Sequence, residues 1–398
     1  MRPIFALARG ILLAGTLTSA AHAQNAGNLL NQFNEIVFGN VVSGSETEGR
    51  AAIGGNLTQS GAGSYCFQTD DGTGPCGSAA LPPTTPQIGG ITVGAATQSF
   101  GALTVYGNVS GAVGAQYGNI FIGGTNTAGI TLNGSGQTAY VNNQGTSSAV
   151  GGTGSLVYAT TANGATPHSQ NGTVNQGSFA LASFATTFQN PLQNLSSYLG
   201  TMTGINQGTS NTFNATPTTI DGVKVTVYNV QGSNLPTVIQ NFNFQLNGAQ
   251  TVVINVIGSV GSLSTNLNGF AGSDQVIWNF QGPGSLTLPS WAGTILAPTD
   301  ALTMNGISQG DIVAASLTQG GNEIHDYAFT GNLSFVPTGS GTTAPEPTGL
   351  AAIALGTGVL LALRRRLHSP ASGKGKRLCK RIMSSSAPAR PAAFSPTA

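Results

Sequence analysis

Short apolar segments alternate with turns rich in glycine and asparagine from residue 24 to residue 336. Several are triplets with a threonine between two apolar residues, such as residues 91–93 (Ile-Thr-Val), 130–132 (Ile-Thr-Leu) and 286–288 (Leu-Thr-Leu). Because side chains alternate between the two faces of a strand, this pattern predicts short strands that bury their apolar residues and turn threonine outward. Pairs such as Asn133-Gly134 predict the turns between them.

Many short strands of this kind fit either a β-sandwich or a β-solenoid. Charged residues are scarce on the predicted strand faces, and glycine and asparagine turns are frequent. Both features favour a solenoid, in which polar residues stack on their counterparts in the next coil. We therefore predict a mainly β fold, an irregular β-solenoid or β-helix whose coils follow no strict repeat length.

One segment has a helical pattern instead. Between residues 178 and 202 the apolar side chains fall at helical spacing: Leu181, Phe184, Ala185, Phe188, Leu192, Leu195 and Leu199. This stripe predicts an amphipathic helix, and Pro191 should start a second helical piece or kink the first. The polar side carries no Lys or Arg, so we expect the helix to pack alongside the β body and not on a membrane.

The first 23 residues have the order of a secretory signal peptide. Basic residues precede an apolar stretch around residues 11–17, and Ala21 and Ala23 occupy the small-residue positions of a cleavage site. The mature chain is therefore predicted to begin at Gln24.

The other end of the sequence has the order of a membrane anchor. Residues 348–363 are apolar and would form a helix about 24 Å long, which is short for a bilayer core of about 30 Å but long enough for a sorting anchor. The linker at residues 337–347 precedes this predicted transmembrane helix. Arg364, Arg365 and Arg366 follow it and should stay in the cytoplasm.

The linker ends in Pro345-Glu346-Pro347, and this order of motif, apolar helix and arginines resembles the PEP-CTERM sorting signal of Gram-negative bacteria. The resemblance implies that a membrane transpeptidase of the exosortase type recognises Pro345, Glu346 and Pro347 and cuts near them. Residues 364–398 form a longer basic tail than such signals usually have, and their composition predicts disorder.

Charge is scarce and unevenly distributed. Only 6% of residues are charged, and residues 24–345 hold eleven acidic side chains against two cationic ones, Arg50 and Lys224, a net charge of about −9. Such a body repels phosphate backbones, which excludes nucleic acid as a partner. The excess of acids leaves cations as candidate ligands.

Two small groups of residues are candidates for specific chemistry. Cys66 and Cys76 lie in one glycine-rich loop and predict a disulfide in an exported chain. Glu46, Glu48 and Arg50 alternate along the chain and so point the same way. We favour an internal ion pair with Arg50, and a Ca²⁺ site at Glu46 and Glu48 is the alternative.

The sequence predicts no catalytic residues. His325 follows Glu323 and precedes Asp326, but in a strand Glu323 and His325 share one side while Asp326 lies on the other. We expect a structural role for this group, not a metal or catalytic site. A body with two cationic side chains also lacks the clustered acids and bases of polysaccharide lyases, so we predict that the protein is not an enzyme.

Two passages are similar to the start and finish of the choice-of-anchor A domain. The first comprises residues 33–39 (FNEIVFG) and 44–56 (GSETEGRAAIGGN), and the second comprises residues 276–280 (VIWNF), 291–298 (WAGTILAP), 310–315 (GDIVAA) and 323–329 (EIHDYAF). The resemblance implies a β-helical adhesive module over residues 24–336, with an insertion at about residues 64–90. That family supplies no catalytic residues.

These features predict an exported, surface-anchored protein of a Gram-negative bacterium, an adhesin or a component of the extracellular matrix or biofilm. We expect a transient inner-membrane anchor through residues 348–363 and a final location at the cell surface, outer membrane or matrix. Expected partners are the exosortase-type enzyme and an extracellular polysaccharide or other surface ligand. One alternative is binding of ice or another ordered surface, suggested by outward threonines in residues 91–93 and 302–304 (Leu-Thr-Met). A polysaccharide-acting enzyme, suggested by fold analogy alone, is the other.

Overall fold

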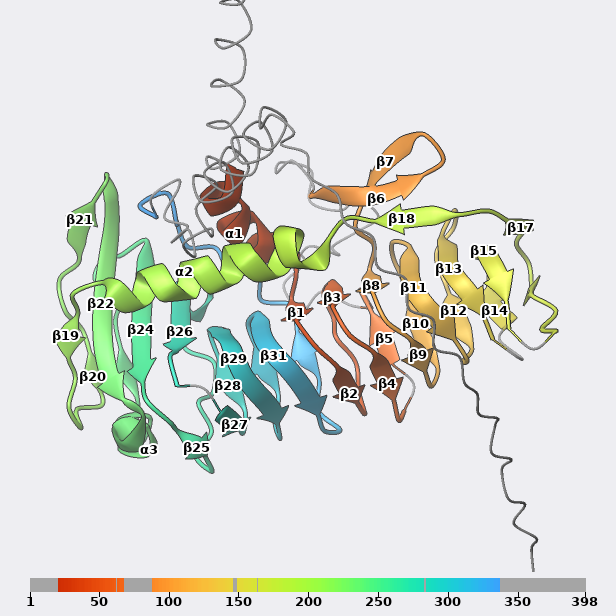
Figure 1. The fold of residues 1–398 in the computed structure, drawn as a ribbon. Coiled ribbons are helices and arrows are strands. Elements are labelled where there is room, and N and C mark those ends of the chain that lie inside the picture. Colours follow the sequence, from red (N-terminus) through yellow and green to blue (C-terminus); the bar gives the residue numbers. More distant parts are fainter. Residues whose placement is uncertain are drawn as a thin grey trace, which may run out of the picture. The chain divides into compact units, whose positions relative to one another are not determined.

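The computed structural model describes residues 21–61, 63–67, 88–145, 149–162, 164–282 and 284–336. Their core is a β-solenoid in which most neighbouring strands pair in parallel (Figure 1). A full coil contributes one strand to each of three faces, which we name the helix face, the open face and the third face. The predicted mainly β fold with a helix alongside is therefore confirmed.

The strands of each face follow one another along the solenoid. The helix face contains β1 (Glu35–Val37), β3 (Ala51–Ile53), β8 (Leu103–Val105), β17 (Val174–Gln176), β19 (Ile205–Asn206), β22 (Val223–Gln231), β24 (Thr251–Ile257), β26 (Val276–Phe280) and the first parts of β11 (Ile120–Asn126), β13 (Thr138–Gln144), β15 (Ser155–Thr161), β29 (Thr294–Met304) and β31 (Ile312–Gln319). The open face contains the later parts of those five strands with β2 (Val41–Ser43), β4 (Leu57–Gln59), β9 (Val109–Ser110), β25 (Gly261–Ser262) and β27 (Gly284–Leu288). The third face contains β5 (Gly63–Tyr65), β10 (Val113–Ala115), β12 (Ile130–Leu132), β14 (Ala149–Gly152), β16 (His168–Ser169), β28 (Trp291–Ala292), β30 (Ser308–Gln309) and β32 (Ile324–His325).

Shorter elements decorate the solenoid. An antiparallel sheet contains β6 (Gly89–Val93), β7 (Ala96–Ser99) and β18 (Phe179–Leu181), β20 (Thr212–Phe213) pairs with β23 (Asn243–Phe244), and β21 (Thr218–Ile220) pairs with β22. A short helix, α3 (Leu235–Val238), follows a 3₁₀ turn at Gly232–Asn234, and a second 3₁₀ turn spans Ser273–Gln275.

The first coil of the chain lies between the second coil and the last. β1 pairs with β3 on one side and with β31 on the other, and β2 pairs in the same way with β4 and β31. We call this junction the seam. The chain coils from the seam to β17, crosses back along the helix face, and then coils from β22 to the seam again (Figure 1). Strands distant in sequence therefore share one continuous sheet.

The crossing segment is helical, as the sequence predicts. A π-helix (Ala185–Gln189) leads into α2 (Asn190–Thr201), and Pro191 is the second residue of α2, so it lies where the π-helix changes into the α-helix. The helical part begins later than residue 178, because β18 pairs antiparallel with β6 instead. Leu192, Leu195 and Leu199 are buried against the helix face.

Two apolar cores lie on opposite sides of the helix-face sheet. One fills the interior of the solenoid, and the other lies between the sheet and its helices. The second core includes Leu29 and Leu30 of α1 (Ala21–Gln32), a helix that the sequence analysis did not predict. The predicted cleavage residues Ala21, Ala23 and Gln24 fall within the bounds of this helix, and cleavage there stays a prediction.

Several predicted segments lie outside the described residues. They include residues 1–20, the sorting motif at Pro345–Pro347, the apolar segment at 348–363 and the arginine cluster at 364–366. Among the described residues, no helix is both long and apolar enough to cross a membrane. The anchor and the sorting signal therefore stay predictions.

Candidate functional site

The open face presents a straight row of outward side chains. The strand register aligns Thr303 with Thr318, Thr318 with Val42, and Val42 with Thr58. The row extends further in both directions, and its members in order along the face are Ser262, Thr287, Thr303, Thr318, Val42, Thr58 and Ser110. Apolar residues that directly precede row members on their strands, such as Leu57 and Leu302, point into the interior. The period-2 pattern of the sequence is thus what turns the hydroxyls outward.

A second outward row runs parallel to the first, two residues earlier on each strand. Asn40, Asn56 and Asn108 stack in this row, and each Oδ1 accepts from the main-chain N–H of the next member at 2.8–2.9 Å. The ladder then continues through Thr125, whose Oγ1 accepts from Asn143 Nδ2 at 3.0 Å. These bonds fix the side chains in one orientation, so the row is ordered before any ligand arrives.

The two rows form an uncharged array with regular spacing. Coils in such a stack lie about 4.8 Å apart, and positions i and i+2 of a strand lie about 6.6 Å apart. Thr58, Ser110 and Thr318 are exposed, and Val42 is 45% exposed. An array of hydroxyl, amide and methyl groups can contact a ligand that repeats at similar intervals. The row members named above include no acidic or basic side chain.

A group of ionisable side chains gathers on the third face at the seam. Thr47 pairs in parallel with both Tyr65 and Ile324, which places Glu46 beside Glu323 and Glu48 beside His325. Donor atoms of Glu48, Glu323 and His325 lie within 4.8 Å of one another, and His325 Nε2 lies 3.3 Å from Glu323 Oε2. Burial, and then the charge of Glu323, raises the pKa of Glu46.

This seam group contains the residues of the described chain that could hold a metal ion. Two carboxylates and one imidazole suit a transition metal better than Ca²⁺, which prefers six or more oxygens. The sequence placed Glu323 and His325 on one side of a strand but could not show that Glu48 joins them. A Ca²⁺ site at Glu46 and Glu48 stays a prediction.

Arg50 does not take the partner that the sequence suggested. Its Nε donates to the Gly101 carbonyl at 3.2 Å, its Nη2 donates to the Phe100 carbonyl, and its guanidinium lies 4.8 Å from the centre of the Phe33 ring. Arg50 is fully buried, and burial lowers its pKa to about 10. Main-chain carbonyls thus replace Glu46 and Glu48 as its partners, which ties the second coil to the third.

Other predicted or overlooked residues have structural places. Cys66 is buried and disulfide-bonded, whereas Cys76 lies outside the described residues, so their pairing stays a prediction.

Residues 306–310 (Gly-Ile-Ser-Gln-Gly) match the G-x-S-x-G pattern of a nucleophile elbow. Ser308, however, is fully buried in β30, and its hydroxyl donates to the Gly310 carbonyl at 3.4 Å. A buried strand position cannot present a nucleophile.

Sequence reasoning noted the threonine triplets but missed the asparagine row. A signal for it exists in the repeated Gly-Asn-apolar triplet, which starts at Gly39, Gly55 and Gly107. The unequal gaps between these triplets conceal the repeat, because residues 64–102 include the excursion through β6 and β7.

The structure is thus a β-solenoid with one uncharged face of aligned hydroxyl and amide groups. The family model described as "Putative Ice-binding-like adhesive domain" matches residues 26–326, and the chain belongs to that family. A solved ice-binding protein from an Antarctic bacterium, Flavobacteriaceae, is similar at 17% identity over 76% of this chain and 84% of that chain, with a TM-score of 0.21. No curated protein matches the chain.

Proposed function

We propose that this protein is an exported, surface-attached adhesin that uses the open face to bind an extended, regularly spaced surface such as a polysaccharide. The observation that carries the proposal is the pair of in-register, uncharged rows represented by Thr58 and Asn56. A ligand with repeating hydroxyls would meet the same groups on each coil, so many weak contacts would add up without any deep pocket.

The proposal includes the route to the surface. A signal peptide ending at Ala23 would export the chain, and an exosortase-type enzyme would process it at Pro345-Glu346-Pro347 after transient anchoring through residues 348–363. The adhesive family and the similarity to choice-of-anchor A domains support this role. A matrix or biofilm location follows from the same reasoning, and catalysis has no part in it.

Bulky substitutions on the open face test the proposal. Replacing Thr58 and Thr318 with Tyr breaks the regular surface of the first row, since both side chains are exposed. Thr131, in β12 of the third face, and Thr153, directly after β14, are also exposed. Their Tyr variants are the matched control. We expect the open-face pair to lose retention on immobilised polysaccharides while the control pair keeps it. Equal retention of both would contradict the proposal.

A second candidate function is binding to ice or another crystalline surface. The specific observation in its favour is that the first row presents hydroxyl and methyl groups together, at Thr303, Thr318 and Thr58, on one register line. Purified protein should then show thermal hysteresis and shape ice crystals, and the Thr58→Tyr, Thr318→Tyr pair should abolish both effects. Their absence from the unmodified protein would dismiss this candidate.

A further inference from the structure

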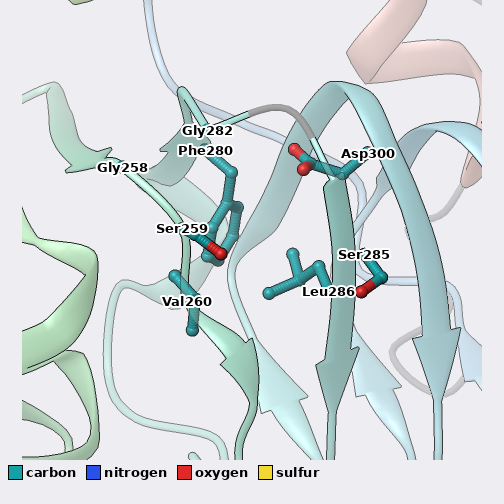
Figure 2. A pocket seen from close by; sticks show the side chains of 8 residues that line it. All are labelled: Gly258, Ser259, Val260, Phe280, Gly282, Ser285, Leu286 and Asp300. Carbon is teal, nitrogen blue, oxygen red and sulfur yellow. The ribbon is translucent and has the colours of Figure 1, made fainter.

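A small recess opens at the border of the open face. It lies where β27 pairs with β29, beside the turn that precedes β25, and its polar lining comes from Ser259, Ser285 and Asp300 (Figure 2). The remaining lining is the Phe280 ring, the side chains of Val260 and Leu286, and the glycines at 258 and 282. The cavity volume is about 10 Å³, which is the room needed by one water-sized group.

Asp300 is the unusual member of this lining. The residue is 3% exposed, and among the described residues its Oδ2 has no hydrogen-bond partner. Figure 2 shows the carboxylate turned toward the side of the recess on which Phe280 and Ser259 lie. Burial raises the pKa of Asp300 to about 6, although the Gly284 N–H donates to the carboxylate and opposes the shift. A buried carboxylate oxygen without a donor is costly, so a donor in the recess would be strongly favoured.

A local irregularity in β29 aims this carboxylate inward. Ala297 pairs with Ala314 and Ala301 pairs with Ser316, so β29 carries residues 298–300 where β31 carries only Ala315. Such a bulge bends the strand and redirects a side chain. The Asp300 carboxylate therefore lies at a bend of β29, where the neighbouring strand β31 has only Ala315.

We propose that this recess binds a protonated primary amine carried by the surface ligand, such as an amino-sugar unit or a lysine side chain. An ammonium group is close to water in size, brings three donors for Asp300 and Ser259, and can also interact with the Phe280 ring. A hydroxyl would leave the charge of Asp300 unbalanced, and no cationic side chain of the described residues lines the recess. The inference rests on the proposed function, because Ser285 belongs both to the recess and to the second row of the open face.

Beads carrying polylysine or polyglucosamine test the inference, with N-acetylated forms of both polymers as controls that keep the size and remove the charge. At about pH 7 the Asp300 carboxyl is ionised and a lysine amine is protonated. We expect retention on at least one amine polymer and about tenfold weaker retention of Asp300→Asn, as for loss of one charge-assisted contact. The polymer that is retained identifies the source of the amine.

Asp221→Asn is the matched control, since it removes the same charge from an exposed turn outside the recess. Asp221→Asn should bind like the unmodified protein. Equal binding by Asp300→Asn would overturn the inference by showing general attraction to the acidic body. Equal retention on the acetylated polymers would overturn it by showing that the contact needs no ammonium charge. Retention should also fall as the pH drops through about 6, and Asp300→Asn should lack this fall.

The outcome is separable from that of the proposed function. Asp300→Asn removes a desolvated charge and should fold with unchanged or higher thermal stability, so a binding loss is not a folding loss. If the unmodified protein adheres to neutral polysaccharides but to neither amine polymer, this inference alone fails. If it binds an amine polymer through Asp300 but no neutral surface, and the open-face Tyr pair has no effect, the proposed function fails instead.

Discussion

Ser196 and Asn279 hold each other by two hydrogen bonds across the interface between α2 and the helix face. The Ser196 hydroxyl donates to Asn279 Oδ1 at 2.7 Å, and Asn279 Nδ2 donates back to the Ser196 carbonyl at 3.0 Å. Asn279 Nδ2 also reaches Asn255 Oδ1 at 2.8 Å, and Asn255 Nδ2 donates to the Leu199 carbonyl at 2.9 Å. A buried polar ladder therefore fixes the position of the crossing helix along the sheet.

Replacing Asn279 should weaken the attachment of α2 to the helix face. Asn279→Ala removes the buried hydrogen bonds that the Ser196 hydroxyl and Asn255 Oδ1 make to Asn279, so we expect a loss of about 3 kcal/mol in the free energy of unfolding. Ser196→Ala should cost about 1–2 kcal/mol. Urea denaturation of both variants and of the double variant gives the coupling energy, which should reach about 1 kcal/mol or more. Additive single effects would contradict a direct pair.

Glu35 should make stability depend on pH. Its carboxyl is fully buried in the solenoid interior near Tyr65, its Oε2 accepts from the Thr47 hydroxyl at 2.8 Å, and burial raises its pKa to about 7. A raised folded pKa means that the folded state holds the proton more tightly than the unfolded chain does. The stability from this group is fully present below the unfolded value of 4.5 and is lost as the pH rises through about 7.

The variant Glu35→Gln removes that titration and keeps an acceptor for Thr47. The unmodified protein should lose about 3 kcal/mol more than Glu35→Gln between pH 4.5 and pH 7, as measured by urea denaturation at several pH values. The same pH profile in both proteins would show that Glu35 does not carry the effect.

Gly111 should be far less tolerant of substitution than Gly136. Both have positive φ, 86° and 75°, so alanine strains the backbone at each. A Cβ at Gly111 would also lie 1.8 Å from the Gln59 carbonyl oxygen, whereas a Cβ at Gly136 meets no atom of the described residues within 4 Å. We expect Gly136→Ala to cost about 1 kcal/mol and Gly111→Ala at least about twice that. Thermal denaturation of the two variants checks this, and similar melting temperatures would contradict it.

Processing of the tail should depend on Glu346. Because prolines at 345 and 347 disfavour regular helix or strand pairing, we expect the motif to be accessible to a membrane protease. The mature protein should therefore end near residue 345, and Glu346→Gln should trap the full-length chain in the membrane. Mass spectrometry of the surface form settles the point, with Thr343→Ser as a control outside the motif. Peptides from residues 367–398 on the surface form would refute the prediction.

The sequence by itself determined which residues of many strands turn inward and that the segment crossing the helix face is helical, although it did not reveal α1. Leu57-Thr58 and Leu302-Thr303 show why: alternation in a strand and the three-to-four spacing around Leu192 and Leu195 are local properties that survive in the final fold. The predictions of an export signal and a sorting signal also rest on short segments. These features need no knowledge of what lies beside each strand.

Only the tertiary structure decided which coils are neighbours. β1 lies between β3 and β31, so Glu48 meets His325 across the seam and Val42 joins the row of Thr318 and Thr58. The partners of Arg50 and the inward turn of Asp300 likewise depend on adjacent coils and on a bulge. Pairing between strands hundreds of residues apart leaves no local periodicity, because it is set by burial and main-chain hydrogen bonds of the whole solenoid.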